Sequence, residues 1–241
     1  MKRIVPVAAI VLAFVFLLPV GVLAQRPAVD VDAPDRPAEE KARDEFSKPL
    51  EMLEWIGVEP GSVVVDFHAG SGYTTWILSE WVGPDGVVFT EMSGRRAAPL
   101  LERLETGDLA EQQNIVYVDA LSKLPTDSLD LFLTVRNYHD VAPERIPMFL
   151  DEVERALAPG GLFVVVDARA PKGRDEEGHR IADEVIVSEV TAAGFDLVES
   201  SELLANPEDD HEGADWETRD QVDQSLLKFR APTGEADAAS P

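Results

Sequence analysis

The chain has 241 residues, with 46 acidic residues against 21 Lys and Arg, and its formal net charge is −25. A surface this acidic repels phosphate backbones and anionic lipids, so we expect no nucleic-acid partner. The chain contains no cysteine, which excludes a disulfide framework, a thiol nucleophile and a cysteine-based metal site.

The first 24 residues predict export from the cytoplasm. Lys2 and Arg3 precede a long apolar run, and Val22 and Ala24 occupy the positions that a signal peptidase recognises. We therefore expect a signal peptide over residues 1–24, with cleavage after Ala24. The alternative is an uncleaved anchor, because the apolar run is long enough to span a bilayer. Both interpretations place the rest of the chain in the periplasm or outside the cell, since basic residues stay inside. We expect no membrane association once the leader is cleaved.

Composition divides the rest of the chain into three parts. Residues 25–40 are rich in proline, alanine and acids and predict a disordered linker. Residues 41–231 have the hydrophobic patterning of a folded domain, and residues 232–241 predict a disordered tail.

Helical and strand patterns alternate along this domain. The predicted helices cover residues 41–56, 74–82, 95–112, 143–161 and 179–195. The predicted strands cover residues 63–67, 87–92, 114–120, part of 128–140, 162–169, 196–203 and 225–232. The last two strands have no helical pattern between them, so they must run antiparallel to each other. The sequence therefore predicts an α/β fold with a doubly wound, mostly parallel seven-stranded sheet and an antiparallel last strand. Ligands bind such sheets at the carboxyl ends of the strands.

The segment VVVDFHAGSGYTT, residues 63–75, combines a buried strand with a glycine turn. Asp66 ends the strand, while Gly70 and Gly72 allow the backbone to approach a ligand closely. A dinucleotide-binding turn would have a third glycine where Thr75 stands. The turn resembles instead the D-x-G-x-G-x-G motif of class I S-adenosylmethionine-dependent methyltransferases, whose sheet also has one antiparallel strand. His68 stands where that motif has its first glycine, which narrows the expected pocket.

This resemblance implies S-adenosylmethionine as cofactor and assigns residues to it. Asp66 and the glycine turn would hold its methionine part, and Glu91 at the end of the second strand would accept both ribose hydroxyls. Met92 would pack on the adenine face, and Asp119 at the end of the third strand would meet the adenine amino group. We include His68 in the glycine turn and Asn137, after the fourth strand, among the cofactor-binding residues.

A second resemblance covers the chain from about Arg43 to Phe229. The segments ARDEFSKPLEMLEWIGVEPGSVVVDFHAGSGYTT, NYHD and HRIADEVIVSEVTAAGF are similar to a family of bacterial predicted methyltransferases that often carry signal peptides.

The NYHD turn, residues 137–140, follows the fourth strand, where methyltransferases place substrate and catalytic groups. His139 and Asp140 are the predicted catalytic residues, with the pair acting as general base towards a hydroxyl or acidic nucleophile. The alternative is that Asn137 and Asp140 cap a helix that begins near Pro143.

The four histidines, His68, His139, His179 and His211, all fall at or above the predicted ligand edge. His179 is expected at the start of the last helix, and the loop NPEDDHEGADWE is expected to bring Asp209, Asp210 and Trp216 over the same edge. One hypothesis for this group is an acid–base set or a divalent-metal site, but no tight spacing such as H-x-x-x-H supports a metal, so we assign none. Taken alone, His179 and His211 are typical of exposed loop residues.

Three functions are compatible with these patterns. The first is methyl transfer to a small molecule or envelope component. The second is an exported binding protein that has the methyltransferase fold, and the third is a metal-assisted hydrolase that uses the histidines and acids. Export conflicts with the first function, because S-adenosylmethionine is made in the cytoplasm, whereas the acids at three strand ends favour it.

Overall fold

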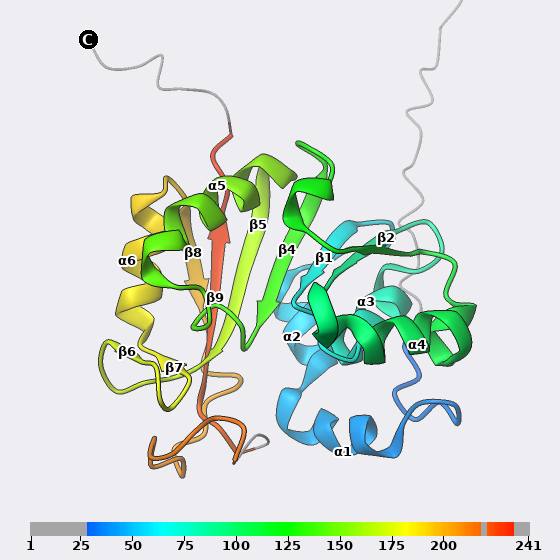
Figure 1. Ribbon diagram of the computed structural model, residues 1–241, viewed down its shortest axis with the longest axis horizontal. Coiled ribbons are helices and arrows are strands. Elements are labelled where there is room, and N and C mark those ends of the chain that lie inside the picture. The colour runs from blue at the N-terminus through cyan, green and yellow to red at the C-terminus, as the bar shows by residue number, and fades with distance from the viewer. Residues whose placement is uncertain (1–27, 218–220, 234–241) are drawn as a thin grey trace, which may run out of the picture.

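The structure, a computed structural model, describes residues 28–217 and 221–233 (Figure 1). The predicted leader and the end of the predicted tail lie outside the described residues. Among the residues that are described, none of the helices has the length and apolar character needed to cross a membrane.

One seven-stranded sheet forms the centre of the molecule, in the order β3-β2-β1-β4-β5-β9-β8. The strands are β1 (Val63–Phe67), β2 (Val87–Glu91), β3 (Ile115–Val118), β4 (Leu129–Val135), β5 (Leu157–Ala168), β8 (Asp196–Ser200) and β9 (Gln224–Arg230). Strands β1 to β5 pair in parallel, and β9 lies antiparallel between β5 and β8. The predicted fold class is therefore confirmed.

Helices cover both faces of this sheet, which is why the central strands are apolar on both sides. The helices are α1 (Ala38–Ser47), α2 (Pro49–Ile56), α3 (Tyr73–Val82), α4 (Ala98–Thr106), α5 (Ile146–Ala156) and α6 (Asp183–Ala192). On one face, Val65 of β1 belongs to a core cluster with residues of α5 and α6. On the other face, Val64 belongs to a cluster with residues of α2, α3 and α4.

The carboxyl ends of the parallel strands meet at one edge of the sheet, at the lower end of Figure 1. Helix α1, a small hairpin of β6 (Arg174–Asp175) and β7 (Arg180–Ile181), and the loop that precedes β9 all lie at this end (Figure 1). These three elements surround the edge of the sheet at which ligands bind in folds of this kind.

Several predicted boundaries are wrong. The helix predicted over residues 41–56 is two helices, because Lys48 adopts a left-handed φ of 39° and Pro49 begins α2. Residues 28–40 were predicted to belong to a disordered linker, yet α1 begins at Ala38 and the Arg36 side chain is fully buried. Arg36 pairs with Asp44, and Val29, Val31 and Ala33 pack against the core on the face of α2, α3 and α4, so a segment with the composition of a linker is attached to the domain.

Three other helices are shorter than predicted. The helix predicted over 143–161 covers only Ile146–Ala156, because β5 begins at Leu157 and includes Pro159, Gly160 and Gly161. Short 3₁₀ turns flank α4 at Gly94–Ala97 and Asp108–Glu111, in place of one helix over 95–112. The helix predicted from His179 begins at Asp183 instead, because the preceding residues form the β6–β7 hairpin. His179 therefore lies in a hairpin turn.

Candidate active site

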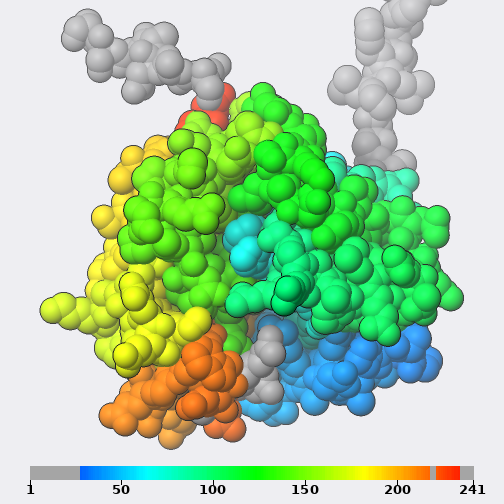
Figure 2. All heavy atoms as spheres, in the orientation of Figure 1, coloured from blue at the N-terminus to red at the C-terminus, as the bar shows by residue number. Residues whose placement is uncertain are grey.

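Two adjoining hollows open at the carboxyl edge of the sheet. The first hollow has a volume of about 380 Å³ and lies between the turn after β1 and the turn after β4. The second hollow has a volume of about 440 Å³ and lies between the ends of β1, β2 and β3 and the start of α5. Figure 2 shows cyan atoms of the β1 region at the floor of a hollow between green and teal atoms. His68 and Asp140 line both hollows, so these two side chains lie where the hollows adjoin.

The turn after β1 has the backbone that its glycine motif requires. Gly70 and Gly72 have φ values of 60° and 95°, in the left-handed region that glycine adopts without strain. His68 also has a positive φ of 53°, so it keeps a glycine-type backbone although it carries a side chain. Its ring stacks on Phe67, with centroids 4.3 Å apart, and its Nε2 lies 3.9 Å from Glu91 Oε2. The imidazole therefore stands between the two hollows.

Asp66 lies at the floor of the first hollow and is only 2% exposed. Thr75 Oγ1 donates a hydrogen bond to its carboxylate at 2.6 Å. Burial raises the pKa of Asp66 to about 7, although the hydrogen bond from Thr75 opposes the shift. The group is therefore close to its ionisation midpoint at neutral pH.

Glu91 occupies the corresponding position in the second hollow. Burial raises the pKa of this carboxyl to about 7, while a hydrogen bond from the backbone N–H of His68, at 3.4 Å, opposes the shift. The remaining lining includes Leu121, Met148 and Phe149, which make an apolar wall. Such a slot suits a flat, mostly apolar ring with a polar group at one end.

The other residues predicted around an adenine ring lie elsewhere. The Met92 side chain packs in the core on the α3 and α4 face and is absent from the lining of either hollow. Asp119 is exposed and forms an ion pair with Lys123 at 2.5 Å. Residues 120–122, which follow Asp119, line the second hollow in its place. The structure thus brings Asp66, His68 and Glu91 together but not Met92 and Asp119.

Asn137 links the two turns. Its side-chain amide donates to the carbonyl of Val135 at 2.7 Å and to that of His68 at 3.4 Å. The predicted alternative, helix capping, is wrong, because Ala142 and Arg145 are the N-cap positions of the 3₁₀ turn and of α5, and neither makes a side-chain capping bond. Asn137 therefore connects the turn after β4 with the turn after β1, and it lines the first hollow.

His139 is held by an acid that the sequence analysis missed. Its Nδ1 lies 2.6 Å from Asp167 Oδ1, and its backbone N–H donates to Asp167 Oδ2 at 2.9 Å. Asp167 is fully buried near the end of β5. Burial alone would lower the pKa of His139, but the hydrogen bond and charge of Asp167, together with Asp140 and Asp215, raise it above its ordinary value. A signal was present, since VVVD occurs at residues 63–66 and again at 164–167.

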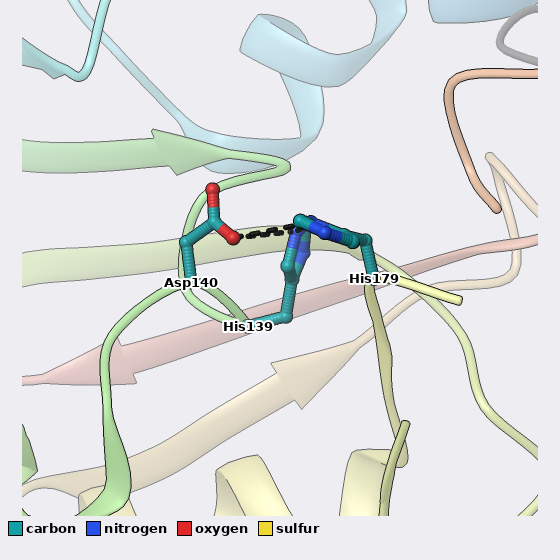
Figure 3. A group of neighbouring side chains, drawn as sticks. All are labelled: His139, Asp140 and His179. Carbon is teal, nitrogen blue, oxygen red and sulfur yellow. Dashed lines mark hydrogen bonds and ion pairs between the residues drawn. The ribbon is translucent and has the colours of Figure 1, made fainter. Parts of the chain in front are cut away.

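His179 reaches the same place from the β6–β7 hairpin. Its Nδ1 lies 3.2 Å from His139 Nε2 and 3.1 Å from Asp140 Oδ1 (Figure 3). The edge of its ring meets Trp216, with centroids 4.5 Å apart. We name His139, Asp140 and His179 the His–Asp–His cluster, which borders the first hollow.

The fourth histidine does not join the cluster. His211 Nε2 lies 3.1 Å from Asp223 Oδ2, and His211 does not line the first hollow. Asp209 pairs with buried Arg180 at 2.8 Å and also lies outside the lining, whereas Asp215 pairs with Arg136 and Trp216 lines the hollow. Three of the four histidines, His68, His139 and His179, therefore line the first hollow, and two of them belong to the His–Asp–His cluster.

Helix α1 supplies a wall of the first hollow that the sequence did not predict. Arg43 lines the hollow and lies over the Tyr73 ring, 4.2 Å from its centroid. Tyr73 donates to Asp44 at 2.8 Å, and Arg36 also pairs with Asp44. Arg36 in turn lies 4.8 Å from the centre of the Trp76 ring. Polar and cation–π contacts therefore attach this N-terminal segment to α3.

Comparison with known proteins places this fold in a group. No family model matches the chain. An arsenite methyltransferase of Halobacterium salinarum (strain ATCC 700922 / JCM 11081 / NRC-1) is 26% identical over 116 residues, which are 47% of this chain and 29% of that protein. The chain thus spans less than a third of that relative.

Solved structures give a more extensive match. A S-adenosylmethionine-dependent methyltransferase from Aquifex aeolicus superposes with a TM-score of 0.60 at 17% identity, covering 83% of this chain and 95% of the other. Aeropyrum pernix fibrillarin in complex with S-adenosylmethionine has a TM-score of 0.50 at 13% identity, covering 75% and 73%. This protein has the fold of the class I S-adenosylmethionine-dependent methyltransferases.

Proposed function

We propose that this protein is a S-adenosylmethionine-dependent methyltransferase that acts on a small molecule or envelope component. The observation that supports it most strongly is the pair of buried carboxyl groups, Asp66 and Glu91, on either side of a glycine-type turn at the carboxyl edge of a methyltransferase-like sheet. The relatives with similar folds that carry this activity, or bind this cofactor, add support.

The two hollows suit the two halves of the cofactor. The first hollow would take the methionine part, whose ammonium group pairs with a carboxylate such as Asp66. The second hollow would take the adenosine part, with both ribose hydroxyls on Glu91 and adenine against the apolar wall. The cofactor carries a positive sulfonium, and a cation favours the ionised form of both carboxyl groups.

The acceptor would lie over the His–Asp–His cluster, on the opposite side of the first hollow from the turn after β1. Asp167 holds His139 Nδ1, so Nε2 is the nitrogen that faces the cluster and can take a proton from an acceptor hydroxyl. Arsenic(III), the acceptor that the name of the Halobacterium relative implies, is a soft centre that favours thiolates, and this chain has no cysteine. We therefore favour an oxygen acceptor.

The proposed location is outside the cytoplasm. The basic start, apolar run and small residues before Gln25 support an exported domain, and so does the resemblance to bacterial predicted methyltransferases that carry signal peptides.

Titration calorimetry with S-adenosylmethionine and S-adenosylhomocysteine tests the cofactor site. We expect Asp66→Asn and Glu91→Gln each to weaken binding by about ten- to a hundredfold, since each removes a charge-assisted hydrogen bond worth about 1.5–3 kcal/mol. Glu105→Gln, on the exposed face of α4, is the matched control and should bind normally. Asp119→Asn decides whether the exposed acid after β3 takes part. Absence of binding by wild-type protein with a folded circular dichroism spectrum would contradict the proposal.

A further inference from the structure

The His–Asp–His cluster brings three ligand-type atoms to one point. His139 Nε2, His179 Nδ1 and Asp140 Oδ1 form a triangle with sides of 3.2, 3.1 and 3.6 Å. Figure 3 shows the two rings and the carboxylate converging from the turn after β4 and from the hairpin. Two imidazoles and one carboxylate are ligand types that transition-metal ions prefer.

These separations match the spacing of ligands around a small divalent ion. Metal–ligand distances of about 2.1 Å place neighbouring ligand atoms about 3.0 Å apart at octahedral angles and about 3.4 Å apart at tetrahedral angles. Two sides of the triangle, 3.1 and 3.2 Å, fall within this range and the third, 3.6 Å, exceeds it slightly, so an ion needs no large movement of the backbone. The chain sequence hides this set, because His139 and His179 are separated by 40 residues.

Asp167 provides the outer support that metal-binding histidines have in proteins. It accepts a hydrogen bond from His139 Nδ1, which leaves the lone pair of Nε2 directed at the cluster. Asp167 also accepts the backbone N–H groups of His139 and Ala168, so the carboxylate is fixed at both oxygens. The buried acid therefore sets the tautomer that a metal ligand requires.

The cluster is accessible from two directions. It borders the first hollow on one side, and on the other it borders a third hollow of about 340 Å³ that is also lined by Glu144, Asp175 and Glu176. These acids and the net charge of −25 concentrate cations at the site. An ion bound by three protein atoms keeps open positions for a substrate oxygen.

We propose that His139, Asp140 and His179 bind a divalent transition-metal ion, such as Zn²⁺, at the boundary between the first and third hollows. Mg²⁺ and Ca²⁺ prefer all-oxygen ligands and fit the two imidazoles less well. The ion would coordinate an acceptor hydroxyl, which then loses its proton to solvent more readily, and His139 would serve as ligand in place of general base. Binding of the ion requires neither the cofactor nor the acceptor, so this site extends beyond the proposed function.

Calorimetric titration of ZnCl₂ into the full chain, after treatment with EDTA and dialysis, tests the site. We expect one ion per chain, much weaker binding of MgCl₂, and loss of at least tenfold in Zn²⁺ affinity in His179→Ala, whose side chain is only half-buried in a hairpin. Asp167→Asn should weaken Zn²⁺ binding by about 10–100-fold through the orientation of His139.

His211→Ala is the matched control, because His211 is paired with an acid elsewhere on the surface and should not affect the affinity. Equal Zn²⁺ affinity of wild-type protein and His179→Ala would overturn the proposal and leave the cluster as a network of hydrogen bonds. Titration of S-adenosylmethionine into the same EDTA-treated protein reports on the proposed function separately, so either one can fail alone.

Discussion

The donor and acceptor sides of the candidate site are built in different ways. The donor side, around Asp66, His68 and Glu91, comes from one stretch of chain and from two neighbouring parallel strands. The acceptor side combines the turn after β4, the end of β5, the β6–β7 hairpin and the loop before β9. The donor side therefore depends on local backbone conformation, whereas the acceptor side depends on contacts between residues far apart in sequence.

The two sides therefore need different amounts of the surrounding structure in order to form. A strand that ends in an acid and a turn with positive φ need only a few adjacent residues. The acceptor side needs buried ion pairs, such as Arg180 with Asp209, to hold a loop and a hairpin in place. The loop and the hairpin lie outside the seven-stranded sheet, so their side chains can change without altering the sheet. Such a region is suited to determine which acceptor binds.

The largest effect is expected at the N-terminal segment that supports the donor side. Arg36→Met leaves Asp44 without its buried partner, and breaking a buried ion pair costs about 3 kcal/mol or more. For a domain of this size that loss lowers Tm by about 10 °C. Thermal unfolding followed by circular dichroism measures it, with exposed Arg95→Met as control. An unchanged Tm in Arg36→Met would mean that residues 28–47 are not part of the stable domain.

A smaller loss of stability is expected from Asp167→Asn on the acceptor side. The amide cannot accept all the hydrogen bonds that the buried carboxylate accepts, and an unsatisfied buried group costs about 1–3 kcal/mol. Because Asp167 does not line the hollows that would hold the cofactor, the Kd for S-adenosylmethionine should not change. Calorimetry on the folded variant measures this Kd. A large loss of cofactor affinity would show that the two sides are not independent.

Ligand-free protein should lose stability as pH rises. Asp66 and Glu91 have folded-state pKa values of about 7, above their ordinary values of 3.8 and 4.5, so the folded state binds protons more tightly than the unfolded chain. The free energy of unfolding therefore falls from about pH 4 to about pH 7 and then levels off with respect to these groups. The double variant Asp66→Asn, Glu91→Gln should flatten this part of the profile.

The same two groups predict the pH dependence of cofactor binding. A cationic ligand favours the ionised carboxylates, so S-adenosylmethionine should raise Tm more at about pH 8 than at about pH 6. Differential scanning fluorimetry at both pH values, with and without the cofactor, measures the difference. Equal shifts at both pH values would argue against contact between the cofactor and these acids.

The smallest effect is expected at His68. His68→Gly removes a side chain from a residue with φ of 53°, which relieves strain of about 1 kcal/mol and opens the passage between the hollows. We expect cofactor affinity to rise severalfold in both His68→Gly and His68→Ala, with Gly the more stable of the two variants. Calorimetry and thermal unfolding separate the two effects. Weaker binding in both variants would show that the imidazole contacts the cofactor.

Much of the fold could be predicted from the sequence. The buried parallel strands are continuous apolar runs, and the missing helix before β9 indicates an antiparallel strand, so the sheet was predictable from hydrophobic periodicity. The N-terminal segment could not be predicted, because its attachment depends on Arg36 and Arg43 over aromatic rings of α3, and its composition is that of a linker.

The parts of the candidate site that come from neighbouring residues in the sequence were predictable, and the parts that depend on distant contacts were not. Asp66, His68 and Glu91 follow from strand ends, and the structure places them together. His179 was expected at a helix start, because nothing in its neighbourhood signals a two-residue-strand hairpin. Met92 and Asp119 were assigned to the cofactor by motif position alone, and their side chains lie in the core and in solvent.

A crystal structure of the protein with S-adenosylhomocysteine tests most directly whether the two sides face each other across one site. We predict the ribose hydroxyls on Glu91 and the amino-acid part beside the turn after β1, with the thioether sulfur directed across the first hollow at the His–Asp–His cluster. A ligand bound outside these hollows, or a sulfur directed away from the cluster, would contradict the assignment of donor and acceptor sides.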